Sequence, residues 1–192
     1  MSKERLYIFD TTLRDGAQTQ GVHFSLDEKT KIAHALDDLG VDYIEGGWPG
    51  ANPSDTEFFQ KGLNLKNSSF TAFGMTKKAG RSAENDPGLS AILNSNTSSV
   101  CLVGKAWDFH VDVALGISKE ENLENISETT KHFVKNNKEF MFDAEHFFDG
   151  YKSNPEYALE CIKAAYDNGA KWIVLCDTNG GTLPHEVTEI VN

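Results

Sequence analysis

Short apolar runs alternate with longer amphipathic stretches along most of the chain. Runs of four to eight residues between helix-length segments are typical of parallel strands joined by right-handed crossovers. The pattern therefore predicts an α/β protein with about six strands. The predicted strands cover residues 6–10, 43–45, 70–73, 99–103, 140–145 and 172–176.

Three of the amphipathic stretches carry clear helix boundary signals. The segments SLDE at 25–28 and SKEE at 118–121 are capping boxes, and Gly40 is a stop signal for the first helix. A third helix is expected to begin at the Asn-Pro pair 154–155 and to end at the Asn-Gly pair 168–169. The expected buried face of the first helix consists of Ile32, Ala35, Leu36 and Leu39.

The number of units decides between two α/β architectures. A further amphipathic helix begins at residue 184, and the sequence stops at residue 192. About six βα units are fewer than a closed (β/α)8 barrel needs, since such a TIM barrel typically takes about 250 residues. We therefore expect a TIM barrel truncated after about six βα units. The alternative is a complete open, doubly wound sheet, but no Gly-rich nucleotide fingerprint follows the first strand.

Composition and charge exclude several classes of partner. The formal net charge is −11, and no run of Lys or Arg offers a track for phosphates, so we expect no nucleic-acid partner. No apolar stretch approaches the ~20 residues of a membrane span, so we expect no membrane partner and a cytoplasmic location. Cys101, Cys161 and Cys176 have no CxxC spacing and are expected to be free thiols.

Polar residues with catalytic chemistry follow nearly every predicted strand. In a barrel, the carboxyl ends of the strands form one ring, where several carboxylates would repel unless a cation lies among them. Oxygen ligands favour a divalent metal such as Mg, Mn or Zn, and the planar fork of Arg14 suits a carboxylate substrate or a developing oxyanion. The strand-end residues are Arg14, Asp15, Gln18, Glu45, Lys105, Trp107, Asp108, His110, Asp143, Glu145, His146, Asp177 and Thr178.

Some of these carboxylates have a structural alternative. For Asp108, Asp143 and Asp177, a structural role as a helix N-cap or loop residue is as consistent with the sequence as a role in the site. Glu145 lies at a strand end beside His146 and two phenylalanines, which favours a partly buried general acid or base. No HxH or HxxxH pair occurs in the sequence, so it does not complete a two-histidine metal site.

Long ordered motifs give the chain a family resemblance. The segment FDTTLRDG at 9–16 resembles the opening motif of the barrel family that includes 2-isopropylmalate synthase, homocitrate synthase, citramalate synthase and hydroxymethylglutaryl-CoA (HMG-CoA) lyase. VDYIEGGWP at 41–49 resembles the end of that family's second strand. KAWDFH at 105–110, FDAEHFFDGY at 142–151 and LCDTNGGTLP at 175–184 resemble the citramalate synthase branch.

The resemblance implies an acyltransferase reaction. Such enzymes condense acetyl-CoA with a 2-keto acid, here pyruvate, in a Claisen reaction and then hydrolyse the thioester to release CoA and citramalate, a reaction of isoleucine biosynthesis. By resemblance, Asp15 is a metal ligand, Arg14 lies beside the keto oxygen and Glu145 takes part in catalysis. Thr178 holds the keto-acid carboxylate, Glu45 is a second acid near the metal, and Gln18 is a hydrogen-bonding group near the substrate.

The chain also departs from the family pattern. The family's other two metal ligands form an HxH motif on the next strand, and the chain ends before it. We therefore expect residues 1–192 to be the N-terminal portion of an HMGL-like catalytic domain, with one strong metal ligand where three are needed. Two alternatives stay open, namely a sibling reaction such as 2-isopropylmalate or homocitrate synthesis or HMG-CoA cleavage, and a catalytically incompetent fragment. In either case, exposed sheet edges favour a homo-oligomer.

Overall fold

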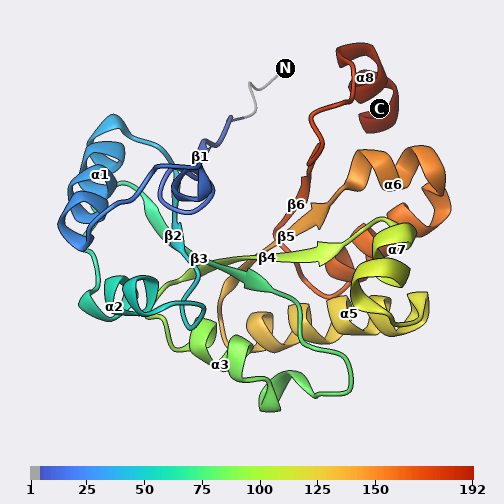
Figure 1. The fold of residues 1–192 in the computed structure, drawn as a ribbon, viewed down its shortest axis with the longest axis horizontal. Helices are drawn as coiled ribbons and strands as arrows, with labels where there is room; N and C mark the ends of the chain where they lie inside the picture. The colour runs from blue at the N-terminus through green and yellow to red at the C-terminus, as the bar shows by residue number, and fades with distance from the viewer. Residues whose placement is uncertain (1–4) are drawn as a thin grey trace.

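Six parallel strands lie side by side in the order of the sequence in this computed structural model, which describes residues 5–192. Figure 1 shows the sheet curling, with the helices on its outer side and its inner, concave side open. The result is a half-barrel of βα units, which confirms the truncated TIM-barrel prediction and not the open doubly wound sheet. The strands are β1 (Phe9–Asp10), β2 (Tyr43–Gly47), β3 (Ser69–Met75), β4 (Ser99–Lys105), β5 (Glu139–Glu145) and β6 (Trp172–Leu175).

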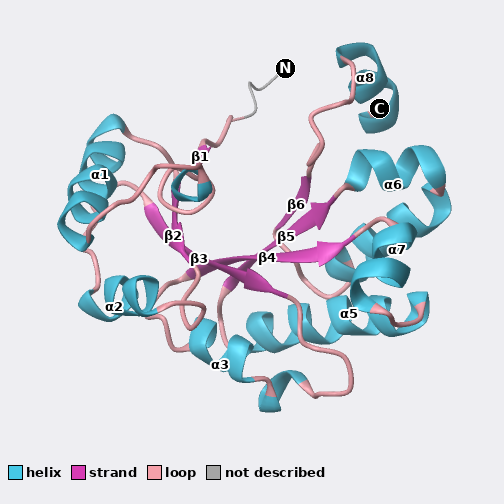
Figure 2. Ribbon diagram, in the orientation of Figure 1, coloured by secondary structure: helices cyan, strands magenta, loops and turns pink. Residues whose placement is uncertain are grey.

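The helices follow the strands, and most of them pack on the outer face of the sheet, whereas the last helix lies beyond the end of the last strand (Figure 2). None of the helices in the described residues is long and apolar enough to cross a membrane. The α-helices are α1 (Leu26–Leu39), α2 (Pro53–Lys61), α3 (Pro87–Leu93), α4 (Asp108–His110), α5 (Lys119–Lys135), α6 (Phe147–Ser153), α7 (Pro155–Tyr166) and α8 (Pro184–Val191). Short 3₁₀ turns cover Gly16–Gln18 and Ala83–Asn85, and a π-helical turn covers Val111–Leu115.

The helix boundaries follow the local sequence signals. Ser25 caps α1 by accepting a hydrogen bond from the Glu28 N–H, and the Glu28 carboxylate accepts from the Ser25 N–H in return. Gly40 ends α1 at a φ of 86°, a left-handed conformation that only glycine adopts without penalty. Ser118 caps α5, and Asn154 caps α7 ahead of a proline at the first helical position. These three predicted helices are confirmed.

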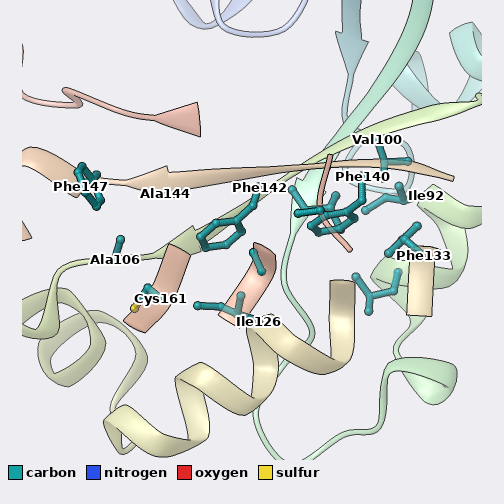
Figure 3. Close-up of a cluster of buried hydrophobic side chains, with 14 of the residues drawn as sticks. Ile92, Val100, Ala106, Ile126, Phe133, Phe140, Phe142, Ala144, Phe147 and Cys161 are labelled. Carbon is teal, nitrogen blue, oxygen red and sulfur yellow. The ribbon is translucent and has the colours of Figure 1, made fainter. Parts of the chain in front are cut away.

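Alternation along each strand divides the side chains between the helices and the concave face. On β4 and β5, Val100, Leu102, Phe140 and Phe142 pack under the helices in the main core, where they meet Ile126 and Phe133 of α5. Figure 3 shows this cluster between the sheet and the helices. The alternate positions, such as Asp143 and Glu145 on β5, are left to face the concave side. One face of the sheet therefore forms the main core, and the other carries the polar strand-end groups beside a small apolar cluster that includes Tyr43, Cys101 and Met141.

The apolar run at residues 6–10 was wrong as a strand prediction over most of its length. Only Phe9–Asp10 is a strand, and Leu6 is 80% exposed. Among residues 5–192, one edge of β1 and one edge of β6 have no strand partner. Ile8 is joined to the start of β2 by hydrogen bonds. Its carbonyl accepts from the N–H groups of Asp42 and Tyr43, and its N–H donates to the Asp42 carboxylate.

The predicted buried face of α1 was also partly wrong. Leu39 is 77% exposed and Ala35 is exposed, whereas Lys29, Ala33 and Asp37 are buried. Two of these are charged residues, and each is satisfied by hydrogen bonds. Lys29 donates to Asp55, and the Asp37 carboxylate accepts from three consecutive backbone N–H groups at residues 66–68. A hydrophobicity pattern does not detect buried charges that are paired in this way.

Candidate active site

The loop after β1 places Arg14 and Asp15 at the rim of the half-barrel. Asp10 ends the strand because its carboxylate accepts hydrogen bonds from the N–H and the hydroxyl of Thr12, which turns the chain. Leu13 is fully buried in a small core beside α1 and anchors the turn. Arg14 and Asp15 follow that anchor, so the loop has little freedom to move them.

Three groups fix the Arg14 guanidinium. Its Nε donates to the Glu45 Oε2 atom at 2.7 Å, and its Nη1 donates to the Asp15 Oδ1 atom at 3.1 Å. The guanidinium carbon lies 4.0 Å from the centre of the Phe73 ring, in a cation–π contact. Arginine carries five N–H donors, so other donors remain for a ligand in the cavity. The guanidinium is thus held in place from three sides before any substrate arrives.

The Gly-Gly pair at the end of β2 allows this strand end to pack closely. A Cβ on Gly46 would lie 2.3 Å from the Phe70 ring, and Gly47 has a φ of 141° with Asp55 atoms 2.6 Å from where its Cβ would be. Asp55 accepts hydrogen bonds from Lys29 and from the Trp48 N–H. The two glycines therefore let a buried ion pair brace the strand that carries Glu45.

Glu45 is completely buried, and burial raises its pKa to about 7. Arg14 opposes this rise, while the neighbouring carboxylates Asp143 and Asp15 add to it. For Arg14, burial lowers the pKa, but the charge and hydrogen bond of Glu45 outweigh it and the net shift is upward. The upward shift of Glu45 is consistent with its geometry, because its Oε1 atom has no hydrogen-bond partner among the described residues. The pair therefore holds a permanent cation next to an acid that titrates near neutrality.

Asp143 is a further carboxylate that burial shifts upward in pKa. It lies within strand β5 and lines the cavity, so it is neither a helix N-cap nor a loop residue. The other two ambiguous acids take structural positions. Asp177 accepts from the N–H and the hydroxyl of Thr182 in the loop after β6, and Asp108 is the first residue of α4.

Glu145 ends β5 and pairs with Lys105 at the end of β4. The two residues are partners in the register of the two strands, and the Lys105 ammonium donates to the Glu145 carboxylate. Both side chains are largely buried, at 16% and 26% exposed. This ion pair neutralises one of the carboxylates that the sequence places in the ring.

Thr178 lies in the loop that follows β6 and contacts the end of β5. Its Oγ1 atom accepts a hydrogen bond of 2.9 Å from the His146 N–H. His146 itself has a φ of 55°, and its Nδ1 atom lies 3.0 Å from the Asp149 carboxylate. The ends of β5 and β6 are therefore linked directly through the hydroxyl that the sequence singles out.

A cavity of about 1160 Å³ on the concave face brings most of the predicted residues together. Glu45 is not among the residues that line the cavity, because it lies behind Arg14. Cys176 lines the cavity as well, and burial raises the pKa of its thiol to about 12, so it stays protonated. All three cysteines are free, as predicted. The strand-end residues singled out from the sequence that line it are Arg14, Asp15, Gln18, Lys105, Asp143, Glu145, Asp177 and Thr178.

Asp15 is the candidate metal ligand with the clearest access. Its side chain is 66% exposed, and one of its oxygens is bonded to Arg14. Within residues 5–192, no three His, Cys, Asp or Glu side chains are grouped closely enough to hold a metal ion. His185 is exposed on α8 and adds no ligand to Asp15. The described residues therefore do not complete a metal site.

Sequence reasoning missed Phe73, which supports Arg14. It placed Lys105 and His146 at strand ends without their roles: Lys105 neutralises Glu145, and His146 contacts Thr178. Strand register would have paired Lys105 with Glu145, since both are the last residues of neighbouring parallel strands. The contact of Phe73 with Arg14 leaves no signal in the sequence, because any apolar residue on β3 is consistent with burial alone.

Comparison with known proteins places the chain in context. It is 55% identical to the (R)-citramalate synthase of Aquifex aeolicus over 97% of this chain and 36% of that protein. It is 49% identical to the (R)-citramalate synthase of Geobacter sulfurreducens over 100% of this chain and 36% of that protein. A 2-isopropylmalate synthase of Caldanaerobacter subterraneus is more distant, at 33% identity over 100% of this chain and 47% of that protein. The chain therefore spans about a third of the length of the citramalate synthases that it matches.

Solved structures show the same fold. The HMG-CoA lyase of Bacillus subtilis superposes with a TM-score of 0.79 at 20% identity, over 98% of this chain and 63% of that one. The HMG-CoA lyase of Pseudomonas aeruginosa gives a TM-score of 0.77 at 17% identity, over 97% of this chain and 62% of that one. The HMGL-like family model matches residues 5–192. With this match over nearly its whole length, the chain belongs to the HMGL-like family.

Proposed function

We propose that the chain carries the keto-acid end of a citramalate synthase site, which condenses acetyl-CoA with pyruvate and hydrolyses the resulting thioester with water to release citramalate and CoA. One observation carries the proposal: a guanidinium held by two carboxylates and an aromatic ring lines the same cavity as Glu145 and Thr178. The identity of 45–55% to several citramalate synthases supports this choice of substrates. We also propose that residues 1–192 are the N-terminal portion of the catalytic domain and that the protein acts in the cytoplasm as a homo-oligomer.

Arg14 is assigned to the oxygen that becomes negative. When the acetyl enolate attacks the keto carbon of pyruvate, the electron pair of the C=O bond moves to the keto oxygen. A fixed guanidinium at that oxygen stabilises the charge without reorganising, and such preorganised donors contribute several kcal/mol in sites that exclude water. The contacts of Arg14 with Glu45 and Phe73 supply that preorganisation.

Thr178 and Glu145 are assigned to binding and proton transfer. The Thr178 hydroxyl donates to the carboxylate of the keto acid, since its oxygen already accepts from the His146 N–H. The Glu145 carboxylate accepts the proton that the acetyl methyl group loses as the enolate forms, and its ion pair with Lys105 keeps it in place at the cavity wall. Gln18 and Asp15 line the same cavity, and we assign Gln18 to a hydrogen bond with the substrate.

A divalent ion such as Mg, Mn or Zn is the cofactor that we propose for the family reaction, with Asp15 as its ligand. The described residues do not complete a metal site by themselves. Calorimetric titration of Mg²⁺, Mn²⁺ and Zn²⁺, with and without pyruvate, tests Asp15. We expect pyruvate-dependent binding that Asp15→Asn weakens and that the exposed control Asp38→Asn does not.

A thiol-release assay with acetyl-CoA and four keto acids tests the reaction and its substrate. We expect free CoA to appear with pyruvate, and less with 2-oxobutanoate, 2-oxoisovalerate or 2-oxoglutarate. Arg14→Ala should lower the rate by about a hundredfold or more, as removal of one oxyanion donor does elsewhere. Arg81→Ala, an exposed arginine outside the cavity, is the matched control.

Any other result of these two assays supports one of the alternative functions or contradicts the role of Arg14. A preference for 2-oxoisovalerate would indicate a 2-isopropylmalate synthase reaction, which the 33% identical relative represents. If neither CoA release nor pyruvate-dependent metal binding occurs, the chain is the catalytically incompetent fragment. If Arg14→Ala condenses acetyl-CoA as fast as the parent chain, the role of Arg14 is wrong.

A further inference from the structure

A strained residue separates the last strand position of β5 from the helix that follows it. His146 has a φ of 55° and a ψ of 34°, in the left-handed region where a residue with a Cβ carries an energetic penalty. Glu145 precedes it directly, and α6 begins at the next residue, Phe147. The sharp turn at His146 thus determines where the β5 strand ends and how Glu145 meets the cavity.

Hydrogen bonds of His146 close a small ring between the ends of β5 and β6. Its N–H donates to Thr178 Oγ1 at 2.9 Å, and its Nδ1 lies 3.0 Å from Asp149 Oδ2. The same Asp149 oxygen accepts from the Asn179 side-chain amide at 2.9 Å. Because Thr178 and Asn179 are adjacent, the four residues form a closed loop of contacts. We call these four residues the strand-end ring.

Aromatic side chains from the end of β4 support the imidazole. The ring centre of His110 lies 4.4 Å from that of His146, in an edge-to-face arrangement, and the ring centre of Trp107 lies 5.7 Å away. Three neighbouring strand ends therefore determine the conformation of His146. A left-handed residue that is held from three sides is the pattern expected where the strained geometry has a purpose.

We propose that His146 is a positioning residue whose left-handed turn orients the Thr178 hydroxyl toward the substrate carboxylate. This inference rests on the role of Thr178 in the proposed function. The His146 N–H occupies one lone pair of Thr178 Oγ1, so the hydroxyl hydrogen is directed to another acceptor, and Thr178 lines the cavity where an anionic substrate would supply one. The same turn fixes the position of the Glu145 side chain, because Glu145 directly precedes His146.

Amide hydrogen exchange of the 192-residue chain tests the contact without any substrate. Thr178→Val removes the acceptor, so we expect the His146 amide to exchange about tenfold faster, while Thr178→Ser, which keeps the hydroxyl, leaves it protected. The Leu102 amide in the middle of β4 is the internal control and should not change. Equal protection of the His146 amide in the parent chain and in Thr178→Val would overturn the proposal.

Three substitutions of His146 separate positioning from direct contact with the substrate. Glycine and asparagine tolerate the left-handed conformation and alanine does not, so we expect His146→Gly and His146→Asn to bind pyruvate within about threefold of the parent chain. His146→Ala should weaken binding by about tenfold. If all three lose binding equally, the imidazole touches the substrate. If all three bind as the parent does while only their melting temperatures fall, the role of His146 is structural, and either result contradicts the proposal.

The two proposals fail in different ways. If the parent chain does not bind pyruvate in the presence of Mg²⁺ or Mn²⁺, the proposed function is wrong for this chain. The exchange of the His146 amide in Thr178→Val still decides whether His146 and Thr178 act together, because it needs neither pyruvate nor metal.

Discussion

Replacing Glu45 by glutamine should make the chain more stable at alkaline pH and leave its stability at acidic pH nearly unchanged. Glu45 is completely buried, and burial raises its pKa to about 7 from an ordinary value of 4.5. Glutamine has almost the same shape as the protonated acid and carries no charge. The substitution therefore removes the cost of ionising a buried carboxyl and retains an oxygen that accepts from the Arg14 Nε.

The magnitude follows from the two pKa values. A group whose folded pKa lies above its unfolded pKa contributes most to stability below the unfolded value, and this contribution is lost as the pH rises through the folded value. The gap between 4.5 and about 7, at about 1.4 kcal/mol per pH unit, corresponds to about 3 kcal/mol. We therefore expect the free energy of unfolding of Glu45→Gln to exceed that of the parent chain by about 3 kcal/mol above pH 8, and to match it near pH 4.5.

Urea unfolding followed by tryptophan fluorescence between about pH 4.5 and pH 8.5 measures this difference. Comparison of the two chains cancels other titrating groups, such as Asp143, to the extent that they do not interact with Glu45. Glu57→Gln, on the exposed side of α2, is the matched control and should follow the parent chain at every pH. If the Glu45→Gln and parent curves run parallel across this range, Glu45 does not titrate near neutrality and the reasoning is wrong.

Three further predictions test the scaffold. Asp37→Ala should cost about 3 kcal/mol at pH 7, because the carboxylate accepts three backbone N–H groups. Hydrogen bonds from three backbone N–H groups and the Ser68 hydroxyl outweigh burial and lower the pKa of Asp37 from 3.8 to about 2. At about 1.4 kcal/mol per pH unit, this gap makes about 2.5 kcal/mol of the difference pH-dependent, so the difference should be full above pH 3.8 and shrink by that amount as the pH falls through 2. An undiminished cost below pH 2 would refute this. Gly46→Ala should lower the unfolding free energy by about 2 kcal/mol or more, because the new Cβ would lie 2.3 Å from the Phe70 ring. Gly181→Ala is the control, since a Cβ at that position has no atom within 4 Å. If the two variants unfold with the same free energy, the prediction is wrong. Cys176 should react with iodoacetamide at pH 8 far more slowly than a free thiol, because its pKa is raised to about 12; a reaction as fast as that of glutathione would show an accessible thiolate.

Capping signals in the sequence predicted three of the helices, and a further helix with the same kind of signal was not predicted. The Asn-Pro pair at 154–155 identified the start of α7, and the same pair at 52–53 starts α2, with Asn52 as its cap. The sequence signal for α2 is therefore identical to that for α7. The six strands were found but most were predicted too short, because polar or glycine residues such as Gly47 and Lys105 end strands that hydrogen bonding continues.

The sequence predicts those parts of the candidate site that lie at the ends of strands. Arg14, Glu145 and Thr178 meet because parallel strands of a barrel direct their carboxyl ends to one rim. The burial of Glu45 behind Arg14 was not predictable, since the sequence gives no distance between β2 and the loop after β1. Likewise, the left-handed conformation of His146 depends on contacts from β4 and β6, and no neighbouring residue in the sequence indicates it.

The order of the strands has a consequence for how the molecule is made. Each strand pairs with the one that precedes it in the sequence, so every new βα unit is added to the edge of a sheet that is already complete. A chain that emerges from the ribosome amino end first can therefore add β2 to β6 one unit at a time, because each of these strands pairs with the strand made just before it. Arg14, on the first loop, would then be braced by β2 and β3 before Glu145 and Thr178 are synthesised.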